Sequence, residues 1–310
     1  MILWPPKQHE LQETSEMSFV VVTDTSCNIP RRIIDSRDIK VIPFSYYVEG
    51  EEHTCNDIEA FDGEGFYAMM KGHVDVTTSQ IPPQRYVDFF EPYVKAGQDL
   101  LFVSMSSGIS GSFSSSNIAA MQLMESYPER TVRAVDTKGA SLGEGLVALR
   151  AADCRDKGMS LEETVKHLCE MRERICQVFT VDDLMFLRKG GRISNVTAIV
   201  GTVLNIKPLL KGDEEGHIVA FGKVRGRKHS IEAIAERYDR LVKNPGEQTV
   251  CIANAACTED AEYLIRLLNR NNPPREIMNV CYEPVTGSHV GPGALALFFE
   301  GDDGARLEIK

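Results

Sequence analysis

DLLFVSMSSGISGSFSSS, residues 99–116, is the stretch that decides how the first half of the chain folds. Its first eight residues are mostly apolar and predict a buried strand over 99–106. Residues 104–116, the serine loop, contain eight serines and two glycines, and the spacing of apolar residues over 111–126 predicts a helix. A loop between a strand and a helix could bind a phosphate, hold a nucleophilic serine or bind another anion.

Strand and helix patterns alternate around this loop. Runs typical of strands occur at 18–24, 39–50 and 131–137, and a helix is expected over 139–157. This alternation predicts an α/β fold in which a mostly parallel sheet has helices on both faces.

The second half of the chain has a different pattern. Helical spacing over 160–174 and 195–206 is followed by β-like runs on both sides of the turn KGDEEG, and further helices are expected over 229–243 and 258–270. We therefore expect a C-terminal α+β domain with strands of mixed direction. The predicted division is an extension over 1–17, an N-terminal α/β domain over 18–172 and a C-terminal domain over 173–310.

The composition excludes several function classes. With 43% hydrophobic and 25% charged residues the chain resembles soluble globular proteins, and a net charge of -11 argues against nonspecific binding of nucleic acid. The basic segment KVRGRKH (223–229) is a local exception. No apolar run approaches the length of a membrane span, and residues 1–17 lack the pattern of a signal peptide.

The cysteines predict a reduced intracellular protein. All eight are scattered, without a CxxC pair, which is the usage expected of inert thiols in the cytoplasm. No spacing of cysteine and histidine suggests a metal site, so neither a metal nor another cofactor is expected.

The serine loop lacks the motifs of three enzyme classes. The chain has no GxxxxGK[ST] phosphate loop, and its first strand ends in TDTSCN instead of the GxGxxG of dinucleotide-binding proteins. Residues 108–112 read GISGS, so the last glycine of a GxSxG nucleophile elbow is displaced by one position. An acyl hydrolase using Ser110 and His289, the latter in the glycine-rich stretch TGSHVGPG, stays open as an alternative. So does a loop whose serines only cap a helix and line a solvated turn.

Four segments of the first half that we expect at strand ends carry small hydroxyl residues. These segments are TDTSCN (23–28), VTTSQ (76–80), the serine loop and VDTKGAS (135–141). We expect them to meet at one edge of the sheet, where the helix beginning after Gly111 would favour a bound anion. In the second half, LMFLRKGGRI (184–193) predicts a helix that ends in two glycines followed by Arg192, whose guanidinium suits a carboxylate or a phosphate.

Taken in order, these segments resemble the DegV family of bacterial lipid-binding proteins over about residues 19–300. TDTSCNIP is similar to the TDS motif of that family, VTTSQIP to its TSQP motif and SSGISGSF to its SSxLSGTY motif. VDTKGASLGEG, LMFLRKGGRI, LNIKPLL, GKVRGRKH and SHVGPGAL follow in the order of the family. The chain departs from the pattern in three places: Thr25 and Ser26 stand in reversed order, Ile81 interrupts TSQ-Pro, and Ser112-Phe113 replaces Thr-Tyr.

The resemblance implies that the chain binds one long-chain fatty acid, with the carboxylate at the junction of two domains and the acyl tail buried in the C-terminal one. It implies a role as a carrier that is not itself an enzyme, and that presents the acid to a separate kinase for acyl phosphate formation. The implied carboxylate site is Thr78, Ser110, Gly111 and His289, and the implied head-group or partner-docking residues are Arg192 and Arg225.

The expected surroundings follow from this role. We expect the tail pocket to be lined by NVTAIVGTVLNI, FTVDDLMFL and ALALFF, although each of these apolar runs is also typical of an ordinary core. The expected partners are the fatty acid and the kinase, with transient contact to a membrane surface and no nucleic acid. The expected location is the cytoplasm.

Overall fold

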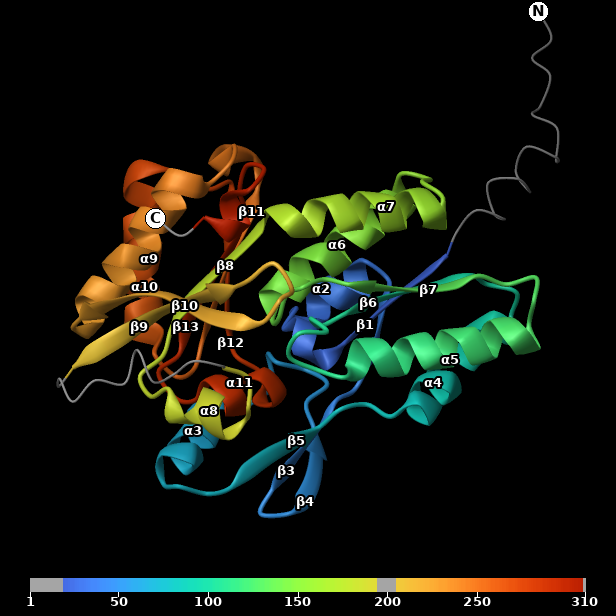
Figure 1. The fold of residues 1–310 in the computed structure, drawn as a ribbon, viewed down its shortest axis with the longest axis horizontal. Coiled ribbons are helices and arrows are strands. Elements are labelled where there is room, and N and C mark those ends of the chain that lie inside the picture. The colour runs from blue at the N-terminus through green and yellow to red at the C-terminus, as the bar shows by residue number, and fades with distance from the viewer. Residues whose placement is uncertain (1–18, 194–204, 309–310) are drawn as a thin grey trace, which may run out of the picture.

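A computed structural model describes residues 19–193 and 205–308 (Figure 1). The extension predicted over 1–17 lies outside these residues. So does nearly all of the helix predicted over 195–206, and with it most of the NVTAIVGTVLNI run.

Four parallel strands form sheet A, in the order β2-β1-β6-β7. Their bounds are β1 Val20–Asp24, β2 Ile39–Ile42, β6 Leu100–Ser104 and β7 Val132–Asp136. Every residue of β1 and β6 is buried, as expected for central strands of a parallel sheet covered on both faces. The parallel order confirms the α/β fold class predicted for the first half.

Two pairs of helices cover sheet A on opposite faces (Figure 1). One pair is α4 (Pro83–Lys95) and α5 (Ser112–Ser126), and the other is α6 (Leu142–Asp156) and α7 (Leu161–Met171). Helix α7 begins at a capping box made by Ser160 and Glu163. It ends three residues earlier than the sequence predicted, because the chain turns through the 3-10 segment η2 (Arg172–Arg174) into the next sheet.

Six strands form sheet C, in the order β10-β9-β8-β13-β11-β12. Only β11 and β12 run parallel, so the mixed strand direction predicted for the second half is confirmed. Helices α9 (Arg227–Leu241) and α10 (Thr258–Asn271) pack on one face of this sheet. The strand bounds are β8 Ile175–Thr180, β9 Ile206–Gly212, β10 Ile218–Arg225, β11 Thr249–Asn254, β12 Glu276–Cys281 and β13 Leu295–Glu300.

A small antiparallel sheet, sheet B, corrects the prediction of one β run over 39–50. That run forms two strands in two different sheets, β2 in sheet A and β3 (Ser45–Val48) in sheet B, where β3 lies between β4 (Glu51–Thr54) and β5 (Val76–Ser79). The break falls at Pro43, which has no backbone N–H to continue the pairing with β1. The next amide, that of Phe44, donates to the Thr25 hydroxyl at 3.0 Å instead.

Short segments complete the described chain. They are the helices α2 (Arg31–Ser36), α3 (Gly63–Lys71), α8 (Met185–Lys189) and α11 (Pro284–Val290), with the 3-10 segments η1 (Thr25–Cys27), η4 (Pro245–Glu247) and η5 (Ala305–Leu307). Helices α3, α8 and α11 contribute apolar side chains to the core on the second face of sheet C.

The domain division over 18–172 and 173–310 stays a prediction. Sheet C is built wholly from residues 175–300, which agrees with the expected boundary. However, Phe66, Tyr67 and Met70 of α3 pack in the core of sheet C although they precede the boundary by about a hundred residues. Residues of the first half thus form part of the core beside sheet C.

Candidate functional site

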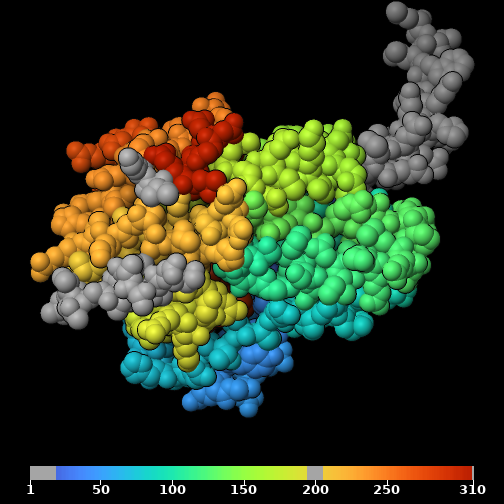
Figure 2. Space-filling view, viewed as in Figure 1, coloured from blue at the N-terminus to red at the C-terminus, as the bar shows by residue number. Residues whose placement is uncertain are grey.

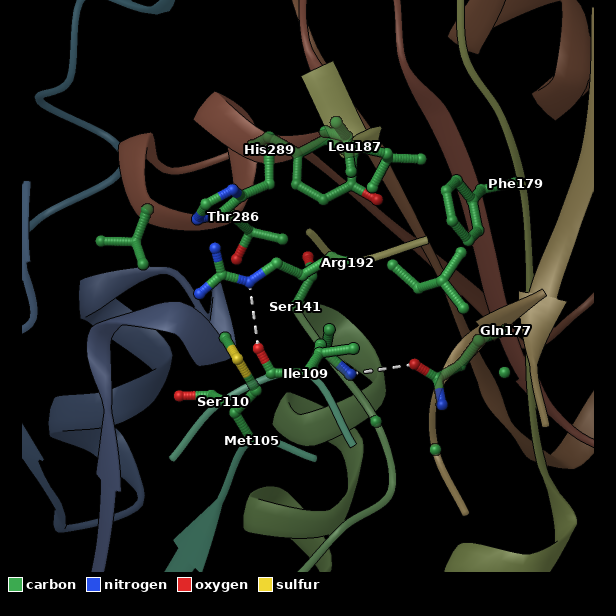
Figure 3. A pocket seen from close by; sticks show the side chains of 18 of the residues that line it. Met105, Ile109, Ser110, Ser141, Gln177, Phe179, Leu187, Arg192, Thr286 and His289 are labelled. Atoms are coloured by element: carbon green, nitrogen blue, oxygen red, sulfur yellow. Dashed lines mark hydrogen bonds between the residues drawn. The ribbon is translucent and has the colours of Figure 1, made fainter. Parts of the chain in front are cut away.

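A pocket lies where sheet A, sheet B and sheet C meet (Figure 3). In Figure 2 the surface is hollowed where the yellow, orange and blue-green segments come together. The space between the lining residues, including the part open to solvent, is about 1010 Å³, at the upper end of the usual range for small-molecule sites. Thr78, Ser110, Gly111, Arg192 and His289 all line it. The structure therefore brings five of the six predicted site residues together.

The serine loop contributes Ser110 to the pocket and uses Ser106 and Ser107 to hold its shape. Ser106 Oγ donates to the Gly216 carbonyl at 2.9 Å, and the Ser110 amide donates to the Ser106 carbonyl at 3.1 Å. The exposed Ser107 donates to the Asp136 carboxylate from both its amide and its hydroxyl. Among the eight serines of the loop, only Ser110 lines the pocket.

Helix α5 begins directly behind Ser110. Gly111 is its N-cap, and the amide of Ser112 donates to Ser110 Oγ at 3.2 Å. The helix N-terminus gives this end of the pocket a partial positive charge. A Cβ on Gly111 would lie 1.9 Å from Oε1 of Gln80, so a larger residue here would require the end of the Gln80 side chain to move.

Thr78 and His289 come from opposite halves of the chain and meet across the pocket. Thr78 Oγ1 and His289 Nε2 are 2.8 Å apart. Thr78 does not end a strand of the parallel sheet, as predicted, but lies within β5 of sheet B. His289 does not lie in a glycine-rich turn either, because Pro284 opens the short helix α11 and His289 occupies its last turn. Burial, and then the neighbouring Arg192, lower the pKa of His289 to about 4, so the ring is neutral at pH 7.

Arg192 joins the two halves beside this pair. It follows α8 as predicted, and its Nε donates to the Ile109 carbonyl of the serine loop at 3.2 Å. Figure 3 places its guanidinium between Ser110 and His289. Burial lowers the pKa of Arg192, yet a guanidinium stays charged in proteins. This end of the pocket therefore holds the Arg192 guanidinium, several hydroxyl groups including those of Thr78 and Ser110, and a helix N-terminus.

The other end of the pocket is mainly apolar. Phe179 and Leu187 come from the predicted run FTVDDLMFL, and Phe298 comes from the predicted run ALALFF. Figure 3 shows Phe179 and Ser110 on opposite sides of the cavity. Gln177 closes this side, because its Oε1 accepts from the Ala140 amide at 3.0 Å.

Arg225 does not reach the pocket. It ends strand β10, pairs across the sheet with Ile206, and its side chain is exposed. The sequence also failed to select Gln80, Lys138 and Thr286, which line the pocket. Gln80 and Lys138 lie in the motif segments VTTSQ and VDTKGAS. Their place in these segments is the only sequence feature that could have pointed to them.

The contacts of Ser110 and His289 differ from those of a hydrolase. The nearest hydroxyl partner of Ser110 is Ser112, to which it donates at 3.1 Å, while His289 is paired with Thr78. A serine nucleophile needs a base hydrogen-bonded to it, and that base needs an orienting acid. Within residues 19–193 and 205–308, Ser110 is not hydrogen-bonded to His289, and His289 is not hydrogen-bonded to an acidic side chain.

Three buried carboxyl groups lie behind the site and were not predicted. Asp24, Glu144 and Glu283 are each 0% exposed, and burial is the main cause that raises the pKa of each. Glu283 caps α11 by accepting from the amides of Val285 and Thr286. Lone acidic residues in a sequence carry no signal of burial, and so these groups were missed.

Asp24→Asn is expected to stabilise the protein at pH 8 more than at pH 5. Burial raises the pKa of Asp24 from 3.8 to about 7, so the folded state keeps a proton that the unfolded state releases. Stability contributed by this group is therefore lost as the pH rises from about 4 through 7. Asparagine cannot ionise and escapes this loss, which is of the order of 2–3 kcal/mol between pH 5 and 8 at about 1.4 kcal/mol per pKa unit. Thermal melts of the variant and the unmodified protein at pH 5 and pH 8 measure this difference. If the substitution changed the melting temperature equally at both pH values, the prediction would be contradicted.

Metal and membrane features are absent from the described chain. Residues 19–193 and 205–308 contain no group of three histidine, cysteine or acidic side chains placed to hold a metal ion. Within the same residues, no helix has both the length and the apolar character needed to cross a bilayer.

Comparison with known proteins identifies relatives over nearly the whole length. The family model described as "Uncharacterised protein, DegV family" matches residues 18–302. A DegV domain-containing protein of Clostridium perfringens is 36% identical over 284 residues, covering 92% of this chain and 98% of its own.

Solved structures agree with these sequence relatives. The crystal structure of DegV, a fatty acid binding protein from Bacillus subtilis, matches with a TM-score of 0.79 and 31% identity over 92% of this chain and all of its own. A DegV family protein from Thermus thermophilus, whose structure concerns fatty acid binding, matches with a TM-score of 0.83 and 25% identity, again over 92% of this chain and all of its own. The order of motifs, the architecture and these matches agree, and the chain belongs to the DegV family.

Proposed function

We propose that this protein binds one long-chain fatty acid, with the carboxylate between Ser110 and Thr78 and the tail toward Phe179 and Phe298. The observation that carries the proposal is a single pocket with one polar, cationic end and one apolar end. The family relatives from Bacillus subtilis and Thermus thermophilus, both described as binding fatty acids, support it.

The energetics assign different tasks to the two ends. A saturated sixteen-carbon acid has about fourteen methylenes, and at about 0.8 kcal/mol each their burial is worth roughly 11 kcal/mol before ordering costs. The tail therefore supplies most of the affinity. Ser110, Thr78 and the start of α5 hydrogen-bond the carboxylate. Arg192 attracts it by charge, while its Nε donates to the Ile109 carbonyl and its Nη1 donates to the Gly190 carbonyl.

The same arrangement suits a carrier that presents its ligand to another protein. We propose that a separate kinase phosphorylates the bound carboxylate, since the sequence has no nucleotide-binding motif and hydroxyl donors leave a carboxylate oxygen free to attack. The protein would act in the cytoplasm and exchange its ligand during transient contact with a membrane surface. The alternative is the acyl hydrolase in which Ser110 is the nucleophile.

Mass spectrometry of the purified protein after denaturation tests the proposal. Release of a free long-chain acid in about equimolar amount supports a carrier. A covalent acyl adduct on Ser110, or hydrolysis of a model ester that Ser110→Ala abolishes, would replace the carrier by the hydrolase. Protein that yields no lipid and takes up none from added hexadecanoic acid would contradict both.

Arg225→Ala is expected to leave the bound fatty acid in place and to slow its phosphorylation by a kinase partner. Arg225 is exposed outside the pocket and belongs to a basic segment of an acidic chain, so its charge can attract a partner without touching the ligand. The loss should be greatest at low salt, where electrostatic attraction is least screened. Phosphorylation rates of the bound fatty acid, measured for both proteins at a series of salt concentrations, check this prediction.

Lys166→Ala is the control for Arg225→Ala. Lys166 has the same charge and is exposed, but it lies in α7, outside the basic segment 223–229. The fatty acid bound to Lys166→Ala should be phosphorylated as fast as that bound to the unmodified protein. If Arg225→Ala empties the pocket, the residue belongs to the carboxylate site, and if it has no effect at any salt concentration, the docking role is wrong.

A further inference from the structure

Ser141 lines the pocket in a backbone conformation that serine seldom adopts. It stands between β7 and α6 with φ 53° and ψ -136°, a region in which a side chain is crowded and glycine is normally found. Backbone hydrogen bonds hold this turn: the Gly145 amide donates to the Ser141 carbonyl and the Gly143 amide donates to the Ala140 carbonyl, both at 3.0 Å. Strain of this kind persists only where the surrounding structure imposes it, and it is typical of ligand sites.

The Ser141 hydroxyl does not take the partner that its position offers. Ser141 is the N-cap residue of α6, where a serine hydroxyl ordinarily accepts from an amide of the first turn, yet it makes no such bond. The residue is 1% exposed and lines the pocket. Its Oγ has no hydrogen-bond partner within residues 19–193 and 205–308. The hydroxyl is therefore buried at the pocket wall with its hydrogen-bonding capacity unused.

Thr286 presents a second hydroxyl of the same kind from the other half of the chain. It stands in the first turn of α11, where Glu283 accepts from the free amides. A helical threonine often donates to the carbonyl one turn earlier, but here that carbonyl, of Tyr282, accepts from the Tyr67 hydroxyl at 2.9 Å. Thr286 is 8% exposed and lines the pocket, and its Oγ1 has no partner among the described residues.

The other buried and half-buried polar side chains of the pocket do have partners. The pairs are Thr78 with His289, Ser110 with Ser112, Lys138 with Glu173, Gln177 with the Ala140 amide and Arg192 with the Ile109 carbonyl. In Figure 3 the two unpaired hydroxyl residues lie between Ser110 and Phe179. They are thus placed between the end proposed for the carboxylate and the apolar end.

An unsubstituted acyl chain would cover these two hydroxyls with methylene groups. This disfavours the complex, because each hydroxyl would give up hydrogen bonds to water and gain none. A hydroxyl group on the chain restores the lost bonds, since a hydroxyl both donates and accepts. A wall with buried polar groups therefore rejects a chain that lacks the matching oxygen more strongly than an apolar wall rejects a chain of the wrong length.

We propose that Ser141 and Thr286 form a second polar site in the pocket, which binds a hydroxyl group carried on the acyl chain. The preferred ligand is then a long-chain hydroxy fatty acid. Its carboxylate lies at Ser110 and Thr78, and its hydroxyl lies between that end and Phe179. The inference rests on the proposed fatty acid function and narrows the class of ligand.

A covalent role for Ser141 is the competing interpretation. Residues 139–143 read GASLG, which matches the GxSxG pattern of a nucleophile elbow, and they form a strained turn between a strand and a helix as such an elbow does. A nucleophilic serine needs a base hydrogen-bonded to it. Ser141 Oγ has no such partner within the described residues, so its hydroxyl is suited to binding and not to acyl transfer.

Competition with radiolabelled hexadecanoic acid tests the proposal. The competitors are hexadecanoic acids that carry one hydroxyl, moved along the chain from carbon to carbon. At least one acid with an internal hydroxyl should bind about tenfold more tightly than hexadecanoic acid, equivalent to about 1.4 kcal/mol. The acid with its hydroxyl on the last carbon should gain nothing, because that oxygen would lie at the apolar end beside Phe179 and Phe298. Indistinguishable affinities across the whole series would overturn the proposal.

Ser141→Gly and Thr286→Val each remove one of the two hydroxyls. Glycine suits the conformation of residue 141, and valine has the size of threonine, so both variants should fold. Each should lose most of the preference for the hydroxy acid. Each should bind hexadecanoic acid at least as tightly as the unmodified protein does, since one unpaired hydroxyl fewer is then buried under the tail.

Thr164→Val is the matched control and should keep the preference. Thr164 of α7 also has a buried hydroxyl with no partner among the described residues, but it does not line the pocket. Circular dichroism verifies the folding of each variant, and if one of the pocket variants is unfolded, the other decides.

Three further results would overturn the proposal. They are a folded pocket variant that keeps the full preference, loss of the preference in Thr164→Val, and an acyl group found covalently attached to Ser141 in the denatured protein. Failure of the unmodified protein to bind any acid of the series, hexadecanoic acid included, would instead refute the proposed function. Uniform binding of the series leaves that function intact and removes only the second polar site.

Discussion

Replacing Thr78 and Ser110 together by alanine is expected to leave a folded protein that supports little or no acyl phosphate formation. In the proposed complex each hydroxyl donates to the carboxylate, and the loss of one such hydrogen bond costs about 1–3 kcal/mol, or roughly five- to 150-fold. The acyl tail still contributes its burial, so the double variant should retain some lipid. Its carboxylate, however, is no longer held in one orientation for phosphoryl transfer.

The single variants and one control make this result interpretable. Ser110→Ala and Thr78→Ala should each lose part of the phosphorylation rate, and the double variant should lose more than either. Ser114→Ala changes an exposed serine of the same loop and should behave like the unmodified protein. Phosphorylation by a kinase partner and retained lipid are measured together. A double variant that is folded, loaded and fully phosphorylated would remove both residues from the carboxylate site.

Much of the fold could be predicted because its strands are short apolar runs closed by turn residues. The runs ending at Asp24, Ser104 and Asp136 form parallel neighbours, as their alternation with helices requires. The serine loop was found for the same reason, since a polar loop after a central strand lies at the edge of the sheet where ligands bind.

The remaining features depend on contacts between distant residues. Sheet B could not be predicted, because β5 pairs with β3 about thirty residues earlier and its sequence, VTTS, has no distinctive pattern. His289 was placed in a turn because its flanking glycines outweighed Pro284 as a helix start. The sequence pattern could not predict that Asp24 and Glu144 are buried, because acidic residues are normally exposed.

The position of Gly108 is another feature that only the structure reveals. The turn between β9 and β10 reaches from sheet C to the serine loop, where Ser106 Oγ donates to the Gly216 carbonyl at 2.9 Å. A Cβ on Gly108 would lie 2.8 Å from the carbonyl carbon of Gly216 and 2.8 Å from the amide nitrogen of His217. Both are backbone atoms, which cannot rotate away as the end of a side chain can. Close approach of two backbones therefore requires glycine here.

Gly108→Ala is expected to destabilise the protein and to weaken fatty acid binding at the same time. Forcing a methyl group into this contact should cost about 1–3 kcal/mol, as overpacking does elsewhere. The clash separates the β9–β10 turn from the serine loop, and so it shifts Ser110 and Gly216, which both line the pocket. Gly246→Ala is the matched control, because a Cβ there meets nothing within 4 Å. Thermal melts and hexadecanoic acid affinity should change together in Gly108→Ala and stay unchanged in Gly246→Ala. Unfolding at a lower temperature with normal affinity would mean that the turn supports the fold without shaping the carboxylate site.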